Sequence, residues 1–86
     1  MRIGPMVNGK AGSEETLDLR GLKCPLPAMK TRTAVARLAR GDVLRVLTTD
    51  PMSAIDVPHA VSGAGGKLFA QRRDGDVLTF DIVKAG

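Results

Sequence analysis

The sequence predicts a two-layer α/β sandwich of order βαβαββ, in which two helices cover one face of a four-stranded mixed sheet. Three observations support this fold class. Short stretches of alternating apolar and polar residues flank two segments with helical periodicity. Glycines follow both helical segments, a common place for a helix to end. The pair Asp74-Gly75 separates the last two alternating stretches and indicates a hairpin.

The first strand is expected at residues 16–20, where Leu17 and Leu19 alternate with polar residues. Residues 1–15 show no periodicity and are expected to form a flexible N-terminal leader. The folded domain would therefore span residues 16–86.

The first helix is expected from Pro25 to about Arg40, where Gly41 stops it. At 100° per residue one stripe of this helix faces the predicted core. The stripe consists of Ala28, Thr31, Ala34, Val35 and Leu38. The other side of the helix is mainly basic, with two apolar residues near its start.

The second strand is expected at residues 42–50, with Leu44, Val46 and Thr48 on one face. A shorter second helix follows, for which Ser53 and Asp56 are candidate N-caps. We favour Asp56, because Pro58 then falls in the first turn, where proline is tolerated.

Two more strands are expected at 67–74 and 76–84. The first two strands, joined through a helix, should be parallel, and the closing hairpin must be antiparallel. The sheet face without helices keeps a few apolar residues, among them Phe69.

Composition indicates one small soluble domain. The chain has 86 residues, 43% of them hydrophobic, and its only aromatic residues are Phe69 and Phe80. No apolar run approaches the ~20 residues that span a bilayer, and the start lacks the apolar stretch of a secretory signal. A single cysteine agrees with a reducing compartment. We therefore expect a cytoplasmic protein that does not associate with membranes.

The net charge of +4 and the pI of about 9.8 raise the question of nucleic-acid binding. Thirteen basic residues are scattered among nine acidic ones, and aromatic stacking platforms are absent. The sequence therefore does not favour direct binding of nucleic acid. A basic face that binds an acidic protein partner accounts for the same charge.

Cys24, the only cysteine, lies in the stretch GLKCPLPAMK at the predicted helix start. We place it at the N-cap, with Pro25, Leu26 and Pro27 at the first three helical positions. Proline suits the first position, since its missing N–H would have no partner there. The N–H of Leu26 is left to point at the capping group.

A thiolate at this position would sit at the positive end of the helix dipole. Lys23 and Arg20 add positive charge nearby. The pattern therefore predicts a thiol pKa below the free value of ~8.5 and a nucleophilic sulfur. A lone cysteine is also often an inert core residue, but its place at a helix start favours reactivity.

Several chemistries do not fit a single cysteine. A dithiol redox centre needs a resolving cysteine, and one Cys with the single His59 cannot complete a zinc site. We therefore expect no metal and no cofactor. A Cys–His hydrolase would need His59 beside the thiol, oriented by Asp50 or Asp56, and an isolated surface histidine is the simpler interpretation. A sulfur that accepts a group and passes it on, as a persulfide, suits the site best.

The stretch LDLRGLKCPLPAMK, with DP at 50–51, DVP at 56–58 and the closing hairpin, resembles the TusA/SirA-like sulfur-carrier family over about residues 16–86. The CPxP motif at residues 24–27 carries most of this resemblance. The resemblance implies a sandwich like the C-terminal domain of translation initiation factor 3. It also implies a sulfurtransferase in which a cysteine persulfide is loaded by a cysteine desulfurase or rhodanese and unloaded onto an acceptor protein.

Family positions carry over residue by residue. Cys24 would hold the sulfur, Pro25 and Pro27 would shape the helix start, and Asp50 and Asp56 match acidic positions that serve as caps or partner contacts. The best-known branch leads to tRNA 2-thiolation, and others serve sulfur oxidation, thiosulfate assimilation or molybdenum-cofactor sulfuration. Leu26 stands where the tRNA branch has Glu, and His59-Ala60 replaces its Gly-Phe pair.

The residues themselves add a candidate docking surface. Leu26 and Met29 are expected to be exposed beside the thiol, with Lys30, Arg37 and Arg40 as a basic rim that suits an acidic partner. Packing of Met29 against a loop and an ordinary solvated basic face remain alternatives. The rival function is a non-catalytic RNA- or protein-binding regulatory module that uses this helix face and would tolerate Cys24→Ser.

Overall fold

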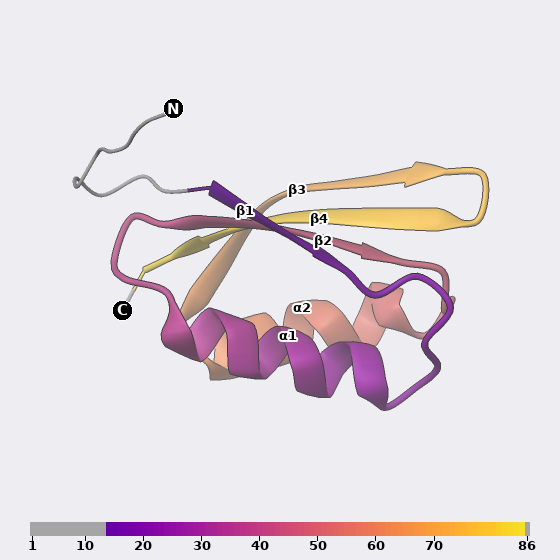
Figure 1. Cartoon of the computed structure of the whole chain (residues 1–86), viewed down its shortest axis with the longest axis horizontal. Helices are drawn as coiled ribbons and strands as arrows, with labels where there is room; N and C mark the ends of the chain where they lie inside the picture. Colours follow the sequence, from indigo (N-terminus) through magenta and orange to yellow (C-terminus); the bar gives the residue numbers. More distant parts are fainter. Residues whose placement is uncertain (1–13, 86) are drawn as a thin grey trace.

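The computed structural model describes residues 14–85 and contains the predicted βαβαββ order (Figure 1). The elements are β1 (Glu14–Asp18), α1 (Leu26–Arg37), β2 (Val43–Thr48), α2 (Ser53–Gly63), β3 (Gly66–Asp74) and β4 (Val77–Lys84). Both helices lie on one face of the sheet, so the predicted fold class is confirmed. Most of the predicted leader, residues 1–13, lies outside the described residues.

The strands form a four-stranded sheet in the order β1-β2-β4-β3. β1 and β2 are parallel, whereas β4 is antiparallel to both β2 and β3, as predicted for the crossover and the hairpin. Because β1 and β2 run in the same direction, the helices that follow them both begin at the same end of the molecule (Figure 1). This arrangement brings the starts of α1 and α2 together.

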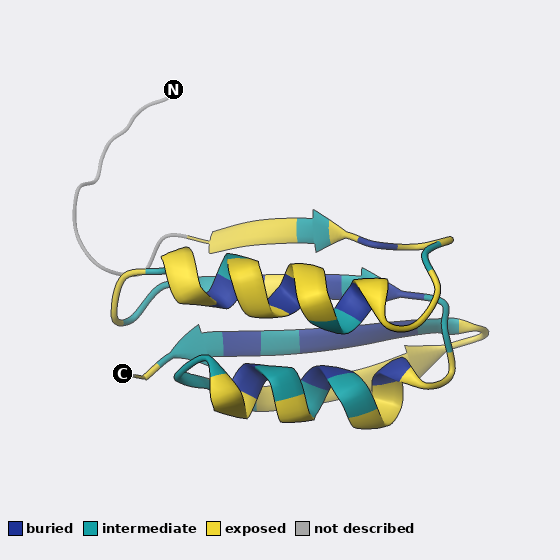
Figure 2. Cartoon of the chain, turned by 90° about the horizontal axis from the view of Figure 1, so that it is seen from below, coloured by how far each residue is buried: buried dark blue, intermediate teal, exposed yellow. Residues whose placement is uncertain are grey.

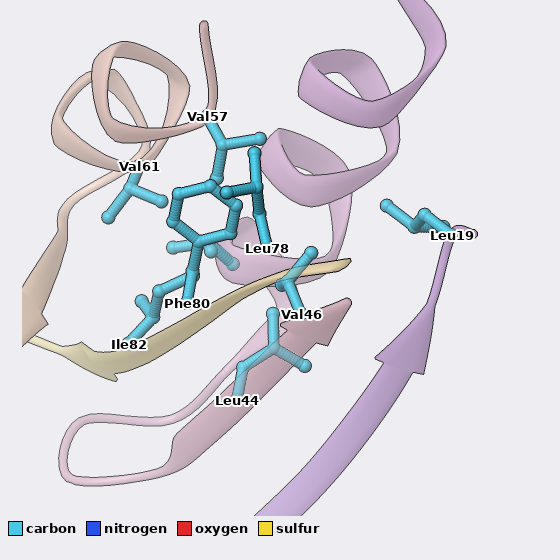
Figure 3. Close-up of a cluster of buried hydrophobic side chains, with 9 residues drawn as sticks. Leu19, Leu44, Val46, Val57, Val61, Leu78, Phe80 and Ile82 are labelled. Carbon is cyan, nitrogen blue, oxygen red and sulfur yellow. The ribbon is translucent and has the colours of Figure 1, made fainter. Parts of the chain in front are cut away.

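The core lies between the sheet and the two helices (Figure 3). Leu44 and Val46 of β2 are buried there, together with Phe80 of β4. Figure 2 shows the division along both helices, whose inner sides are buried while the outer sides are exposed. Each fully buried apolar side chain of this size stabilises the fold by about 1.5–3 kcal/mol. The period-two and period-3.6 patterns of the sequence therefore predicted the correct faces.

The first strand begins and ends two residues earlier than predicted. Leu19, beyond its end, is nevertheless buried, and its N–H donates to the carbonyl of Leu47 at 2.8 Å. At the other end of the chain, the hairpin loop consists of Gly75 and Asp76, since Asp74 pairs with Val77. Gly75 has a φ of 65°, which favours glycine.

α1 ends at Arg37 rather than Arg40, so the predicted C-terminus is wrong. Leu38 is already extended, with ψ at 146°. The N–H of Ala39, which would continue the helix, donates instead to Oδ2 of Asp42 at 2.9 Å. In the last turn the carbonyl of Val35 accepts the N–H of Leu38 at 3.1 Å, and Nζ of Lys84 donates to the carbonyls of Val35 and Ala36 at 3.0 and 3.4 Å.

α2 begins at Ser53, and the prediction that Asp56 caps it is wrong. Met52 occupies the N-cap position without a side-chain bond. Asp50 organises this start instead: its Oδ1 accepts the N–H of Met52 at 3.1 Å and its carbonyl accepts the N–H of Ser53 at 2.9 Å. Pro58 consequently lies inside the helix.

Gly66, at the start of β3, is packed closely against the core. A Cβ built there would lie 2.9 Å from Val35, 3.0 Å from Val61 and 3.1 Å from Ile82. Only a residue without a side chain fits between these three without displacing them. Within residues 14–85, no helix has both the length and the apolar character needed to cross a membrane.

Candidate functional site

Cys24 lies in the turn before α1, where its side chain is exposed and its thiol is free. Pro25, not Cys24, is the N-cap, so the predicted capping register is wrong by one residue. The reason is local: the N–H of Leu26 donates to the carbonyl of Lys23 at 2.9 Å and closes a turn around Cys24. This N–H therefore does not point at the sulfur.

The two prolines shape the helix start in different ways. Pro25 is exposed, and its carbonyl accepts the N–H of Met29 at 3.1 Å, the first bond of the helical ladder. Pro27 is buried against the core. Proline removes two backbone donors from a turn that has no helical acceptors for them.

Asp50 connects this turn to the start of α2. One oxygen of its carboxylate, Oδ2, accepts the backbone N–H of Cys24, and the other accepts the N–H of Met52. The residues of the first contact are 26 apart in the chain. A single carboxylate thus holds the starts of both helices.

Asp56 contacts the thiol itself. The Sγ–H of Cys24 donates to Oδ2 of Asp56 at 3.2 Å. Asp56 lies in the first turn of α2 and is half-buried. The acidic positions identified in the sequence therefore both lie at the cysteine, one on its backbone and one on its sulfur.

The pKa of the Cys24 thiol is raised above its ordinary value, which contradicts the predicted lowering. The hydrogen bond to Asp56 is the main cause, followed by partial loss of solvent and the negative charges of Asp56 and Asp50. Arg20 does not offset them, because it forms an ion pair with Asp18 at 2.7 Å. That pair lowers the pKa of Asp18 to about 2.

Exposed apolar side chains gather at the helix starts. Leu26 and Met29 are 42% and 57% exposed, as predicted. Met52 and Ile55, at the start of α2, are 48% and 67% exposed and were not identified as site residues from the sequence. Both are large apolar residues that lie off the face that α2 buries, and this mismatch was the sequence signal that could have identified them. We call Leu26, Met29, Met52 and Ile55 the apolar collar.

A groove of about 310 Å³ runs between α1 and α2 beside the thiol-bound carboxylate. It is lined by Pro25, Ala28, Met29, Arg32, Asp56, His59 and Ala60. His59 is exposed, and the hydrogen bond of the thiol goes to Asp56 rather than to this imidazole. Within residues 14–85, no group of three or more His, Cys, Asp or Glu side chains could hold a metal ion.

The predicted basic rim is spread along α1. Lys30 is exposed near the helix start, whereas Arg37 is its last residue, ~16 Å further along the axis than Leu26. Arg37 lines a separate cleft with Glu14 and Glu15 of β1, and Arg40 is in the turn that follows α1. Of these cations, Lys30 is thus the nearest along the helix to the start of α1.

Comparisons with known proteins identify relatives over most of the chain. The family model described as sulfurtransferase TusA matches residues 15–84. The sulfur carrier protein TusA of Pseudomonas entomophila is 37% identical over 71 residues, 83% of this chain and 89% of that protein. The sulfur carrier protein TusA of Allochromatium vinosum is 32% identical over 75 residues, 87% of this chain and 99% of that protein.

A solved structure shows the same architecture. The crystal structure of the SirA-like protein from Desulfitobacterium hafniense superposes with a TM-score of 0.69 at 26% sequence identity. The match covers 84% of this chain and 99% of that one. The two chains therefore share the fold of a four-stranded mixed sheet with two helices.

Proposed function

The chain belongs to the sulfurtransferase TusA family, and from this membership we propose that it carries sulfane sulfur as a persulfide on Cys24. The observation that carries the proposal is the exposed, free thiol of the chain's only cysteine, held between the starts of the two helices by contacts with Asp50 and Asp56. A sulfur in this position is accessible to a second protein. The sulfane atom is received from a donor and passed to an acceptor without leaving the protein surface.

The backbone contact of Cys24 supports a carrier rather than a hydrolase. Besides a base, hydrolysis would require free N–H donors that stabilise an oxyanion. Here the sulfur faces Asp56, and the backbone N–H of Cys24 is already bound to Asp50. Exchange of a sulfur atom between thiols needs neither an activated water nor an oxyanion hole.

The apolar collar is the proposed centre of the docking surface. Its four members surround the two helix starts, and solvent reaches a large part of each. A partner that covers them would bury apolar area and exclude water from the sulfur. Residues 19–41 contain six basic residues and no acidic one, which suits a partner with acidic groups around its own reactive sulfur.

The donor in this proposal is a cysteine desulfurase or a rhodanese, and the acceptor is a protein of tRNA 2-thiolation, sulfur oxidation or cofactor sulfuration. Leu26 makes the first turn of α1 apolar at the residue where the tRNA-thiolation branch is acidic. We infer that the acceptor contact at this position is apolar. Arg37 and Arg40, at the far end of α1, would act as long-range charges for association.

Intact-mass measurement tests the proposal. The protein is incubated with a cysteine desulfurase and cysteine in the absence of reductant, and a mass increase of one sulfur atom is expected, reversed by reductant. Cys24→Ser is the matched control, because the substitution is small and the site is exposed. It should fold normally and gain no sulfur. A wild-type protein that gains none would contradict the carrier function and leave a binding module as the better account.

A further inference from the structure

We propose that Asp56 is the proton acceptor of sulfur transfer: its carboxylate takes the Cys24 proton as sulfur is loaded and returns it as sulfur leaves. This inference rests on the proposed persulfide function and assigns a catalytic role within it. On sequence grounds Asp56 was a cap or a partner contact, and the structure gives its side chain neither a capping bond nor full exposure.

The first support is geometric. Oδ2 of Asp56 lies 3.2 Å from Sγ and accepts its proton in a hydrogen bond, so proton transfer requires no rearrangement. Among the residues that the structure describes, the ion pairs are Arg20–Asp18 and Arg45–Asp81. Within the described part of the chain, the carboxylate of Asp56 therefore contacts the sulfur and has no ion-pair partner.

The second support is the absence of a competing base in contact with the sulfur. Both oxygens of Asp50 already accept backbone N–H groups. His59 lines the groove beside Asp56, but the thiol donates to the carboxylate. The charged or titratable side chains around the pair are Lys23 before α1, Arg32 of α1, Asp50, and His59 of α2. None of these forms a hydrogen bond with Sγ within residues 14–85.

The third support is that the resting sulfur holds its proton. The neighbouring carboxylates raise the thiol pKa, so a neutral thiol, not a thiolate, meets the donor at physiological pH. A docked partner covers the apolar collar and keeps water from the sulfur. The proton must then move to a group inside the contact, and Asp56 is that group.

The loading step balances in atoms and charge. Cys24 Sγ attacks the terminal sulfur of a protein persulfide, the donor's S–S bond breaks, and the donor leaves as a thiolate. The Cys24 proton passes to Asp56, which becomes a neutral carboxylic acid. The transferred sulfur keeps its oxidation level, because one S–S bond replaces another.

Unloading is the reverse. An acceptor thiolate attacks the terminal sulfur, and Cys24 leaves as a thiolate next to two carboxylates, where negative charge is unfavourable. Protonation of Sγ by the neutral Asp56 removes that charge and restores the thiol. The same residue is thus base in one direction and acid in the other.

The experiment compares two rates in Asp56→Asn and in the matched control Asp50→Asn. One rate is alkylation by iodoacetamide in open solvent, which follows the thiolate fraction. The other is single-turnover uptake of sulfur from a rhodanese that carries one sulfane sulfur and has been freed of excess thiosulfate. Asp56→Asn removes a negative charge next to the sulfur and should accelerate alkylation. Asp50→Asn removes a charge and also one of two backbone N–H acceptors, so it reports how far a change in the turn alone affects each rate.

Sulfur uptake should separate the two variants. We expect the two rates of Asp50→Asn to change in step, because this variant alters the turn and its charge but keeps the proton acceptor. Asp56→Asn should slow uptake by ~100-fold, the usual scale for loss of a general base, while alkylation rises. If Asp56→Asn speeds uptake in step with alkylation, or leaves both unchanged, the proton-acceptor role is wrong. A wild-type protein that alkylates but takes up no sulfur would instead remove the carrier function itself.

The pH profile of the wild-type protein gives an independent measurement should a variant fold poorly. Alkylation below the thiol pKa rises tenfold per pH unit as thiolate forms. Uptake assisted by Asp56 should rise much less steeply over the same range. A tenfold rise per unit in both reactions would contradict the assignment.

Discussion

The sulfur of Cys24 and the carboxylate of Asp56 are 32 residues apart in the chain and 3.2 Å apart in the fold. The parallel pairing of β1 and β2 produces this proximity, since it places the turns before α1 and α2 at the same end of the sheet. The contact sets the protonation state of the thiol. The pKa of this thiol is therefore the property that reports the contact most directly.

The first prediction concerns the thiol pKa. Alkylation rate measured against pH should show a midpoint above that of a free cysteine, because the hydrogen bond to Asp56 and two nearby carboxylates favour the neutral thiol. Asp56→Asn should move the midpoint downward. A wild-type midpoint at or below the free-thiol value would contradict the contact.

The same shift predicts an alkaline loss of stability. The pKa of Cys24 is raised in the folded state. The stability that this thiol contributes to the fold is therefore fully present below the unfolded pKa of ~8.5 and is lost as the pH rises through the folded pKa. Urea unfolding midpoints should therefore fall more steeply above pH 8.5 in the wild type than in Cys24→Ser. If the urea unfolding midpoints of the two proteins fall in parallel as pH rises, the thiol pKa is not raised by folding.

The proposed docking surface predicts that substitutions at two equally exposed residues affect sulfur uptake differently. Met29 in the apolar collar is 57% exposed and Phe69, on the sheet face without helices, is 58% exposed. Met29→Ser should lower kcat/KM for sulfur uptake from a protein donor by about tenfold, the scale of an interface residue worth ~1.4 kcal/mol. Phe69→Ser should leave it unchanged, and equal losses in both would place the interface elsewhere.

The basic side of α1 predicts salt-sensitive association. Lys30→Glu should lower the association rate with an acidic donor and weaken its dependence on ionic strength, because one steering charge is reversed. Stopped-flow measurement of the association rate from low to physiological salt would show both changes. Arg72→Glu, an exposed residue of β3, makes the same change of charge and should have the smaller effect.

The close packing around Gly66 predicts that an added methyl group destabilises the fold. Gly66→Ala should cost about 1–3 kcal/mol in the free energy of unfolding, because the new Cβ meets Val35 and Val61 at 2.9 and 3.0 Å. Gly63→Ala is the control: a Cβ there contacts nothing within 4 Å. The Tm of Gly66→Ala should fall by roughly 4–8 °C for each kcal/mol lost. The Tm of Gly63→Ala should stay close to that of the wild type.

Local patterns in the sequence were sufficient for the fold class. The alternation of Leu44 and Val46, and of Phe80 and Ile82, identified the buried sheet face, because period-two burial depends only on the strand itself. The order of the strands was not predictable in this way. β4 lies between β2 and β3, and that choice depends on pairing between distant segments.

The errors have two kinds of cause. Contacts within a few residues moved the helix ends, as where Leu26 bonds to Lys23 and Ala39 bonds to Asp42. Distant residues decided other features, such as the last carbonyls of α1, which Lys84 binds from 48 and 49 residues later in the chain. Asp56 reverses the direction in which the cysteine pKa moves, although the charges close to Cys24 in sequence are positive. The helix-dipole reasoning was sound for an isolated helix start, and tertiary contacts with acidic residues outweighed it.

The carboxylate of Asp50 also makes the two helix starts depend on one side chain. Its two oxygens accept the peptide N–H groups of Cys24 and Met52. A substitution that removes both acceptors would therefore loosen the turn that carries the thiol and the entry of α2 together.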